Sequence, residues 1–116
     1  MPMNASVFED GIVDAANQKL TKAFVAKVVA ADGSEDELEA LMVAAVELAN
    51  QEEGTIVWFS VKTDDRTFWV FDAFVDEAGQ QAHANGQIVA ALQANSRLLG
   101  AEPEILPADI LATKMP

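Results

Sequence analysis

The chain has 116 residues, of which 51% are hydrophobic, and its 19 acidic and 7 basic side chains give a net charge of -12. This length predicts one domain with a single core, and the negative field excludes nucleic acid and anionic membranes as partners. The absence of cysteine excludes disulfides and thiolate chemistry. The N-terminus does not resemble a signal peptide, and no apolar run approaches the roughly eighteen residues of a membrane span, so we expect a cytoplasmic protein.

The first half of the chain predicts one strand and one helix. Residues 1–21 form a separate segment, which is either an arm laid on a partner subunit or a partly ordered tail. The run at 22–31 is typical of a strand. Ser34 and Glu37 have the spacing of a capping box. Apolar side chains at intervals of three and four then predict an amphipathic helix that runs up to Gly54.

The next stretch predicts a hairpin followed by a second helix. β-rich runs at 55–62 and 67–75 flank a short polar turn, which indicates an antiparallel pair. Asp76 is the expected N-cap of the helix that follows. Gly79 and Gly86 interrupt the early part of that helix, and regular helical spacing resumes after them.

A last strand completes the predicted fold. Residues 105–115 form it, and Pro107 places it at a sheet edge or a bulge. The order β-α-β-β-α-β is the ferredoxin-like arrangement of an α+β domain with an antiparallel sheet. Both alternating sets of the hairpin strands are apolar, so the sheet face without helices would expose a large apolar patch. We therefore expect a homodimer that stacks sheet on sheet.

Several motifs follow one another in the order found in a known family. They are Glu53-Gly54 before the second strand, the aromatic strand 68–74 with its internal acid, the segment 76–83 that ends in Ala-His, and the closing stretch 109–116. Together they resemble the antibiotic biosynthesis monooxygenases, which include small quinol monooxygenases, over residues 22–116. The resemblance implies a dimeric α/β barrel domain that oxidises a hydroquinone or polycyclic phenol with O2 and without a cofactor.

The chain departs from this family at three points. The family usually has tryptophan where this chain has Phe74, and the chain lacks the tyrosines with which some members hold phenolic substrates. Haem-degrading relatives place a histidine late in the second helix, where this chain has Ala90, Ala91 and Ala94. Because His83 lies earlier, the resemblance does not carry a haem role to this chain.

Asp72 and His83 are the candidate catalytic bases. Asp72 lies inside a strand, where a charge is costly unless it is paired or used, and His83 is the only histidine of the chain. The resemblance implies that both face a pocket under the helices, where either could accept a phenolic proton. The structural alternatives stay open, with Asp72 held by a backbone N–H or an arginine and His83 bonded to a neighbouring strand.

Three further residues are candidate substrate contacts. Phe74 lies on the same face of its strand as Asp72. Asn85 could donate a hydrogen bond to a carbonyl, although asparagines near helix ends often act as caps. Trp58 could stack on a planar aromatic ligand or belong to the core or a dimer interface.

The sequence contains no metal or cofactor motif. One histidine, no cysteine and dispersed acids do not form a typical transition-metal site within one subunit, and no glycine-rich phosphate loop follows a strand. We therefore expect neither a metal nor a cofactor. Two functions remain: the monooxygenase, and a non-catalytic dimeric protein that binds a small hydrophobic ligand. Polar groups that converge around Asp72 and His83 would favour catalysis.

Overall fold

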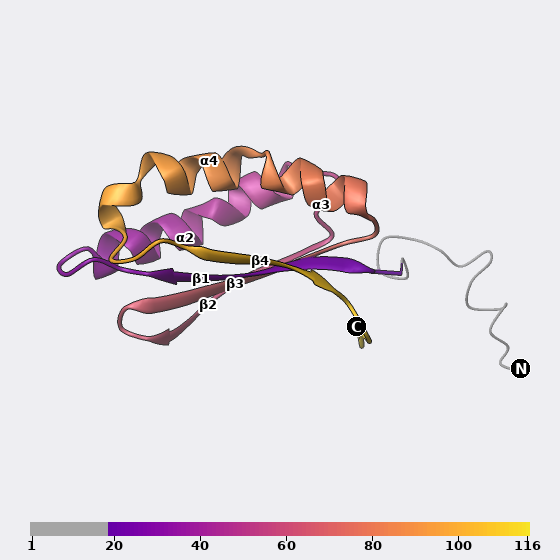
Figure 1. Ribbon diagram of the computed structural model, residues 1–116, viewed down its shortest axis with the longest axis horizontal. Helices are drawn as coiled ribbons and strands as arrows, with labels where there is room; N and C mark the ends of the chain where they lie inside the picture. Colours follow the sequence, from indigo (N-terminus) through magenta and orange to yellow (C-terminus); the bar gives the residue numbers. More distant parts are fainter. Residues whose placement is uncertain (1–18) are drawn as a thin grey trace, which may run out of the picture.

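The computed structural model describes residues 19–116, which form one antiparallel sheet with helices on one face (Figure 1). Nearly all of the predicted N-terminal segment 1–21 lies outside the described residues. In chain order the elements are β1 (Lys22–Val29), α2 (Glu35–Asn50), β2 (Val57–Asp64), β3 (Thr67–Phe74), α3 (Glu77–Ala84), α4 (Gln87–Ala94), the 3₁₀ helix η2 (Ser96–Leu98) and β4 (Glu104–Asp109).

The strands pair in the order β2-β3-β1-β4, and each pairing is antiparallel. Helices α2, α3 and α4 all lie on the same side of this sheet (Figure 1). The predicted ferredoxin-like order is therefore confirmed, with the second helix divided at Gly86 into α3 and α4. Within residues 19–116, no helix combines the length and apolar character needed to cross a membrane.

The core lies between α2 and the sheet. The buried residues of α2 are Leu38, Met42, Ala45 and Ala49, whose spacing of four, three and four places them on one helix face. Leu38 and Met42 belong to one buried cluster with Val28, Phe68 and Leu98. This packing holds α2 against the face of the sheet that forms the floor of the site described below.

Both ends of α2 differ from the sequence-based expectation. Ser34 is the N-cap residue, but its side chain makes no capping hydrogen bond. The carboxylate of Glu37 instead lies 2.8 Å from the guanidinium of Arg97. The predicted capping box is therefore wrong, and the Ser34 backbone N–H that it would use donates to Ala31 O at 2.9 Å. At the other end, α2 stops at Asn50 rather than near Glu53.

Gly54 allows a close approach between two segments and does not directly end the helix. A Cβ atom at this position would lie only 3.1 Å from the Cα of Gly79. The turn that follows α2 therefore passes directly against the first turns of α3. This approach brings residues 52–55 beside α3, and Glu52 among them belongs to the candidate site.

The last strand is shorter than predicted, since β4 ends at Asp109. Its partner β1 starts at Lys22, which pairs with Asp109, and a hydrogen bond from Ile110 N to Thr21 O extends the contact by one residue. Beyond this point β1 offers no strand residues with which to pair. Strand β4 is nevertheless at the sheet edge, as Pro107 predicts.

The face of the sheet without helices carries a row of apolar side chains. Phe59, Phe71, Val25 and Leu106 lie directly opposite one another on the four adjacent strands. Phe59 and Leu106 are each 58% exposed, and Phe71 is 39% exposed. We call these four residues the apolar row. Its exposure agrees with the expected apolar character of the bare face.

Candidate functional site

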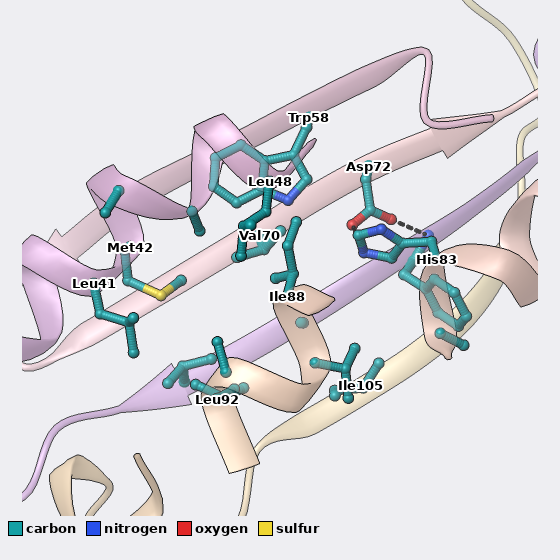
Figure 2. Close-up of a pocket in the computed structure, with 18 of the residues that line it drawn as sticks. Leu41, Met42, Leu48, Trp58, Val70, Asp72, His83, Ile88, Leu92 and Ile105 are labelled. Carbon is teal, nitrogen blue, oxygen red and sulfur yellow. Dashed lines mark hydrogen bonds and ion pairs between the residues drawn. The ribbon is translucent and has the colours of Figure 1, made fainter. Parts of the chain in front are cut away.

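A cavity of about 380 Å³ lies between the helix-covered face of the sheet and helices α2 and α4 (Figure 2). Its apolar wall includes Leu41, Met42 and Leu48 of α2, Ile88 and Leu92 of α4, and Val70 of β3. The lining side chains that carry a nitrogen or oxygen atom are those of Glu47, Trp58, Asp72 and His83. The cavity has the size and the mainly apolar character of a small-molecule site.

Asp72 comes from β3 and lies on the face toward the helices, as the family resemblance implies. Its side chain is only 2% exposed. Its Oδ1 accepts a hydrogen bond from the backbone N–H of Phe24 at 3.2 Å, and its Oδ2 lies 2.9 Å from Nε2 of His83. The burial cost of this carboxylate is thus offset by the predicted backbone N–H and by His83, which takes the place of the arginine expected as the alternative partner.

His83 lies in the last turn of α3 and points toward Asp72 (Figure 2). The helix begins at the Asp76 cap, whose side chain accepts a hydrogen bond from Gly79 N at 3.0 Å, and it ends before Gly86. This break lets His83 face the sheet, where it is 5% exposed. Its ring lies 5.4 Å from the ring of Phe74 and 6.1 Å from that of Phe24, between centroids.

Glu52 is the site residue that sequence reasoning missed. Its Oε1 lies 2.6 Å from Nδ1 of His83 and accepts a hydrogen bond from the Thr55 hydroxyl at 2.7 Å. Its side chain is 20% exposed, so it joins the buried imidazole to solvent. Gly86 leaves room for this carboxylate, because a Cβ there would lie 2.7 Å from Glu52 Oε2.

The imidazole of His83 thus lies between two carboxylates, and we name these three residues the Glu52-His83-Asp72 cluster. A neutral imidazole has one N–H and can donate to only one carboxylate, whereas the protonated ring donates to both. Burial acts to lower the pKa of His83, but the hydrogen bonds and charges of Asp72 and Glu52 outweigh it and raise that pKa above its ordinary value. The cluster therefore favours an imidazolium flanked by two acids.

Because the chain has a single histidine, NMR can follow this group without ambiguity. We expect the imidazole signals to titrate with a midpoint above about 6.5, the ordinary value. Glu52→Gln removes one of the two facing charges and is expected to lower the midpoint. Glu53→Gln removes the exposed neighbouring charge and is expected to leave it unchanged. A wild-type midpoint at or below the ordinary value would contradict the proposed protonation.

The same raised pKa makes the free energy of unfolding depend on pH. The folded state holds the proton more tightly than the unfolded state, so this stabilisation is complete below about pH 6.5 and is lost as pH rises through the folded-state pKa. Thermal unfolding of the NMR samples should therefore lose stability over that window, and Glu52→Gln should lose less. A wild-type stability that rises across this window in step with the histidine titration would contradict the sign.

The other three candidate residues have different surroundings. Trp58 lines the cavity from β2. Phe74 is fully buried, packs against Phe24 and His83, and supports the site from behind the cavity wall. Asn85 is exposed at the C-cap of α3, where its side-chain amide donates to Gln81 O at 3.0 Å. The structure therefore brings Trp58, Asp72 and His83 to the cavity, but not Phe74 or Asn85.

No group of three or more His, Asp or Glu side chains within residues 19–116 is arranged to hold a metal ion. The Glu52-His83-Asp72 cluster uses both imidazole nitrogens for carboxylates. Its arrangement suits proton transfer and the stabilisation of a nearby negative charge.

The fold is that of the antibiotic biosynthesis monooxygenases. A protein from Nitrosomonas europaea that is provisionally named as one superposes with a TM-score of 0.69 at 10% identity, over 78% of this chain and 90% of that one. A protein from Caulobacter crescentus CB15 with the same provisional name gives 0.66 at 19% identity, over 82% and 93%. At these identities the likeness concerns the fold, and it confirms the resemblance and fold class inferred from the motifs.

A second protein from Nitrosomonas europaea, described as of unknown function, is 46% identical over 85% of this chain and 97% of that one, with a TM-score of 0.82. The chain belongs to the same family as this protein. The sequence matches no protein-family model and no curated protein.

Proposed function

We propose that the protein is a cofactor-independent monooxygenase that oxidises a hydroquinone or polycyclic phenol with O2. The observation that carries this proposal is the buried pairing of Asp72 with His83 at 2.9 Å on the wall of a mainly apolar cavity. The provisional names of two proteins with the same fold also support oxygenase chemistry. The cavity suits a planar ring system, and the paired groups suit its ionisable hydroxyl.

In the proposed first step, Asp72 accepts the phenolic proton of the substrate. Both oxygens of Asp72 already accept one hydrogen bond, but each has a second lone pair. The protonated imidazole of His83 then lies beside the new phenolate and stabilises its charge. Glu52 accepts the second N–H of His83 and keeps the ring protonated, while Asp72 holds the phenolic proton, which passes in the second step to the oxygen atom that leaves as water.

In the proposed second step, the electron-rich phenolate reacts with O2 inside the cavity, away from bulk water. The substrate loses two hydrogen atoms and gains one oxygen atom, and the second oxygen atom leaves as water. All four electrons that O2 accepts come from the substrate. The balance therefore requires no external reductant.

Oxygen consumption tests this function. The panel should contain phenols such as 1-naphthol and reduced quinones such as 1,4-dihydroxynaphthalene, with no added flavin or metal. We expect consumption that depends on the protein, with one O2 used per molecule of product. Consumption no faster than in protein-free buffer would contradict the proposal and favour the alternative, a non-catalytic protein that binds a small hydrophobic ligand in the same cavity.

We also propose that the protein acts as a homodimer whose sheets meet through the apolar row. The row crosses all four strands, and its two most exposed members, Phe59 and Leu106, lie on the two edge strands. A second copy of the chain offers the same row and can cover it under two-fold symmetry. Since each copy carries a net charge of -12, the dimer should tighten as salt screens the repulsion.

Light scattering tests this assembly. We expect twice the chain mass of 12.4 kDa for the wild type. Phe59→Lys places a charge in the apolar row and is expected to give monomers, because burying an unpaired charge is costly. Val43→Lys is the control, since Val43 is 64% exposed on α2 and lies away from the bare face. A monomeric wild type, or a Phe59→Lys variant that stays dimeric, would contradict the proposed interface.

A further inference from the structure

The indole N–H of Trp58 is a buried hydrogen-bond donor at the cavity. Its Nε1 atom is shielded from solvent, and no group within residues 19–116 accepts a hydrogen bond from it. Trp58 lies directly across from Asp72 in the pairing of β2 with β3, and both side chains line the cavity. In Figure 2 the nitrogen is on the edge of the indole ring nearer Asp72 and His83.

Trp69, the second tryptophan of the chain, provides an internal comparison. It lies on the opposite face of the sheet, and its Nε1 donates to the Thr63 hydroxyl at 3.1 Å. Buried polar groups in proteins nearly always have a hydrogen-bond partner, and an indole can only donate. Because the Trp58 side chain lines the cavity, its unpaired donor suggests a partner supplied by the ligand.

We propose that Trp58 donates a hydrogen bond to a carbonyl or phenolic oxygen of the ligand and thereby selects oxygenated ring systems over hydrocarbons of the same shape. This inference deepens the proposed function and rests on it for the use of the cavity. It adds a specificity-determining residue, and its test measures binding alone.

The charges around the cavity restrict the ligand further. Two carboxylates and one imidazolium leave the Glu52-His83-Asp72 cluster with one negative charge, and Glu47 adds a second acid to the lining. The whole chain is also strongly acidic. A ligand that arrives as a carboxylate is repelled by this field. The acceptor oxygen therefore belongs to a neutral molecule, which excludes fatty acids and aromatic acids.

The test uses two probes, 1-tetralone and tetralin, which differ in that a carbonyl group of the first replaces a CH2 group of the second. In spectra of the ¹⁵N-labelled wild type, 1-tetralone is expected to shift the Trp58 indole signal downfield and to leave the Trp69 signal in place. Trp69→Phe assigns the two signals. Trp58→Phe keeps an aromatic ring and removes the N–H, so its affinity for 1-tetralone should fall about five- to tenfold, while its affinity for tetralin should not change. Trp69→Phe should change neither affinity.

Other outcomes of these binding experiments would contradict the donor role of Trp58, the neutral ligand class or the monooxygenase proposal. An unshifted Trp58 signal at saturation with 1-tetralone, or an equal loss of affinity for both probes in Trp58→Phe, would overturn the donor role. Failure of the wild type to bind either probe would also overturn it. Trp58-dependent binding of 1-naphthoate that is tighter than that of 1-tetralone would overturn the neutral ligand class. Trp58-dependent binding of 1-tetralone without any oxygen consumption would support this inference and contradict the monooxygenase alone.

Discussion

Asp72→Asn is expected to slow turnover of a phenolic substrate by about a hundredfold to ten-thousandfold, the usual value of a general base. The amide is nearly isosteric with the carboxylate, and its oxygen can still accept the hydrogen bond from Phe24 N. Its NH2 group would then face His83 Nε2, which must become an acceptor. The variant therefore removes the base and also the imidazolium beside the substrate oxygen. We expect the loss mainly in kcat, with KM changed little.

Asp76→Asn is the matched control for this variant. Asp76 lies four residues further along the chain, is exposed and caps α3 from outside the cavity. Asparagine caps helices about as well as aspartate, so activity and stability should both be retained. If Asp72→Asn instead lowers the melting temperature and leaves activity per folded molecule unchanged, Asp72 has a structural role.

Phe74→Ala is expected to lower the free energy of unfolding by about 3–5 kcal/mol, the usual cost of truncating a buried phenylalanine. Phe74 is fully buried and meets the ring of Phe24 edge-on, with centroids 5.9 Å apart. It also packs against His83. The cavity left by the truncation would therefore lie behind the imidazole and loosen its position. Urea denaturation measures the loss.

Phe74→Leu keeps most of the buried volume and should cost clearly less than Phe74→Ala. If Phe74 contacted the ligand and not the core, the alanine variant would lose ligand affinity with less than about 1 kcal/mol of stability. That result would contradict its assignment as a support residue and would restore the substrate contact expected from the sequence.

The fold was predictable because its signals are local. Runs of β-branched and aromatic side chains mark the hairpin strands, and Asp76 and Gly86 mark the start and the interruption of the second helical region. Alternation along β3 places Asp72 on the same face as Phe74, and the family resemblance implies that this face is the one covered by the helices. Gly86 also explains why His83 points inward, since a continuous helix would have turned it toward solvent.

Glu52 was not predictable, because its position depends on contacts that are remote in sequence. Helical periodicity carried α2 to about Glu53 and left Glu52 as one of several acids on a helix. In the structure α2 ends at Asn50, and the close approach of Gly54 to Gly79 brings the following turn against α3. Only this approach places the Glu52 carboxylate beside His83.

The two tryptophans show a similar limit of local patterns. Both lie in strands of aromatic and β-branched residues, and composition does not separate a ligand contact from a packing residue. The register of β2 against β3 separates them, because it pairs Trp58 with Asp72 and Trp69 with Val61 on opposite faces. The indole N–H of Trp69 donates to Thr63 on the bare face, whereas that of Trp58, on the cavity side, has no acceptor within residues 19–116.

The most direct measurement of the proposed function is the fate of ¹⁸O2 in the oxidation of 1-naphthol by the purified protein, with a metal chelator present and no flavin added. We expect a quinone that carries one ¹⁸O atom per molecule, labelled water as the other product and no accumulation of hydrogen peroxide. Asp72→Asn should lose this activity and Asp76→Asn should keep it. An unlabelled quinone formed together with peroxide, or no product above the protein-free reaction, would contradict the monooxygenase proposal.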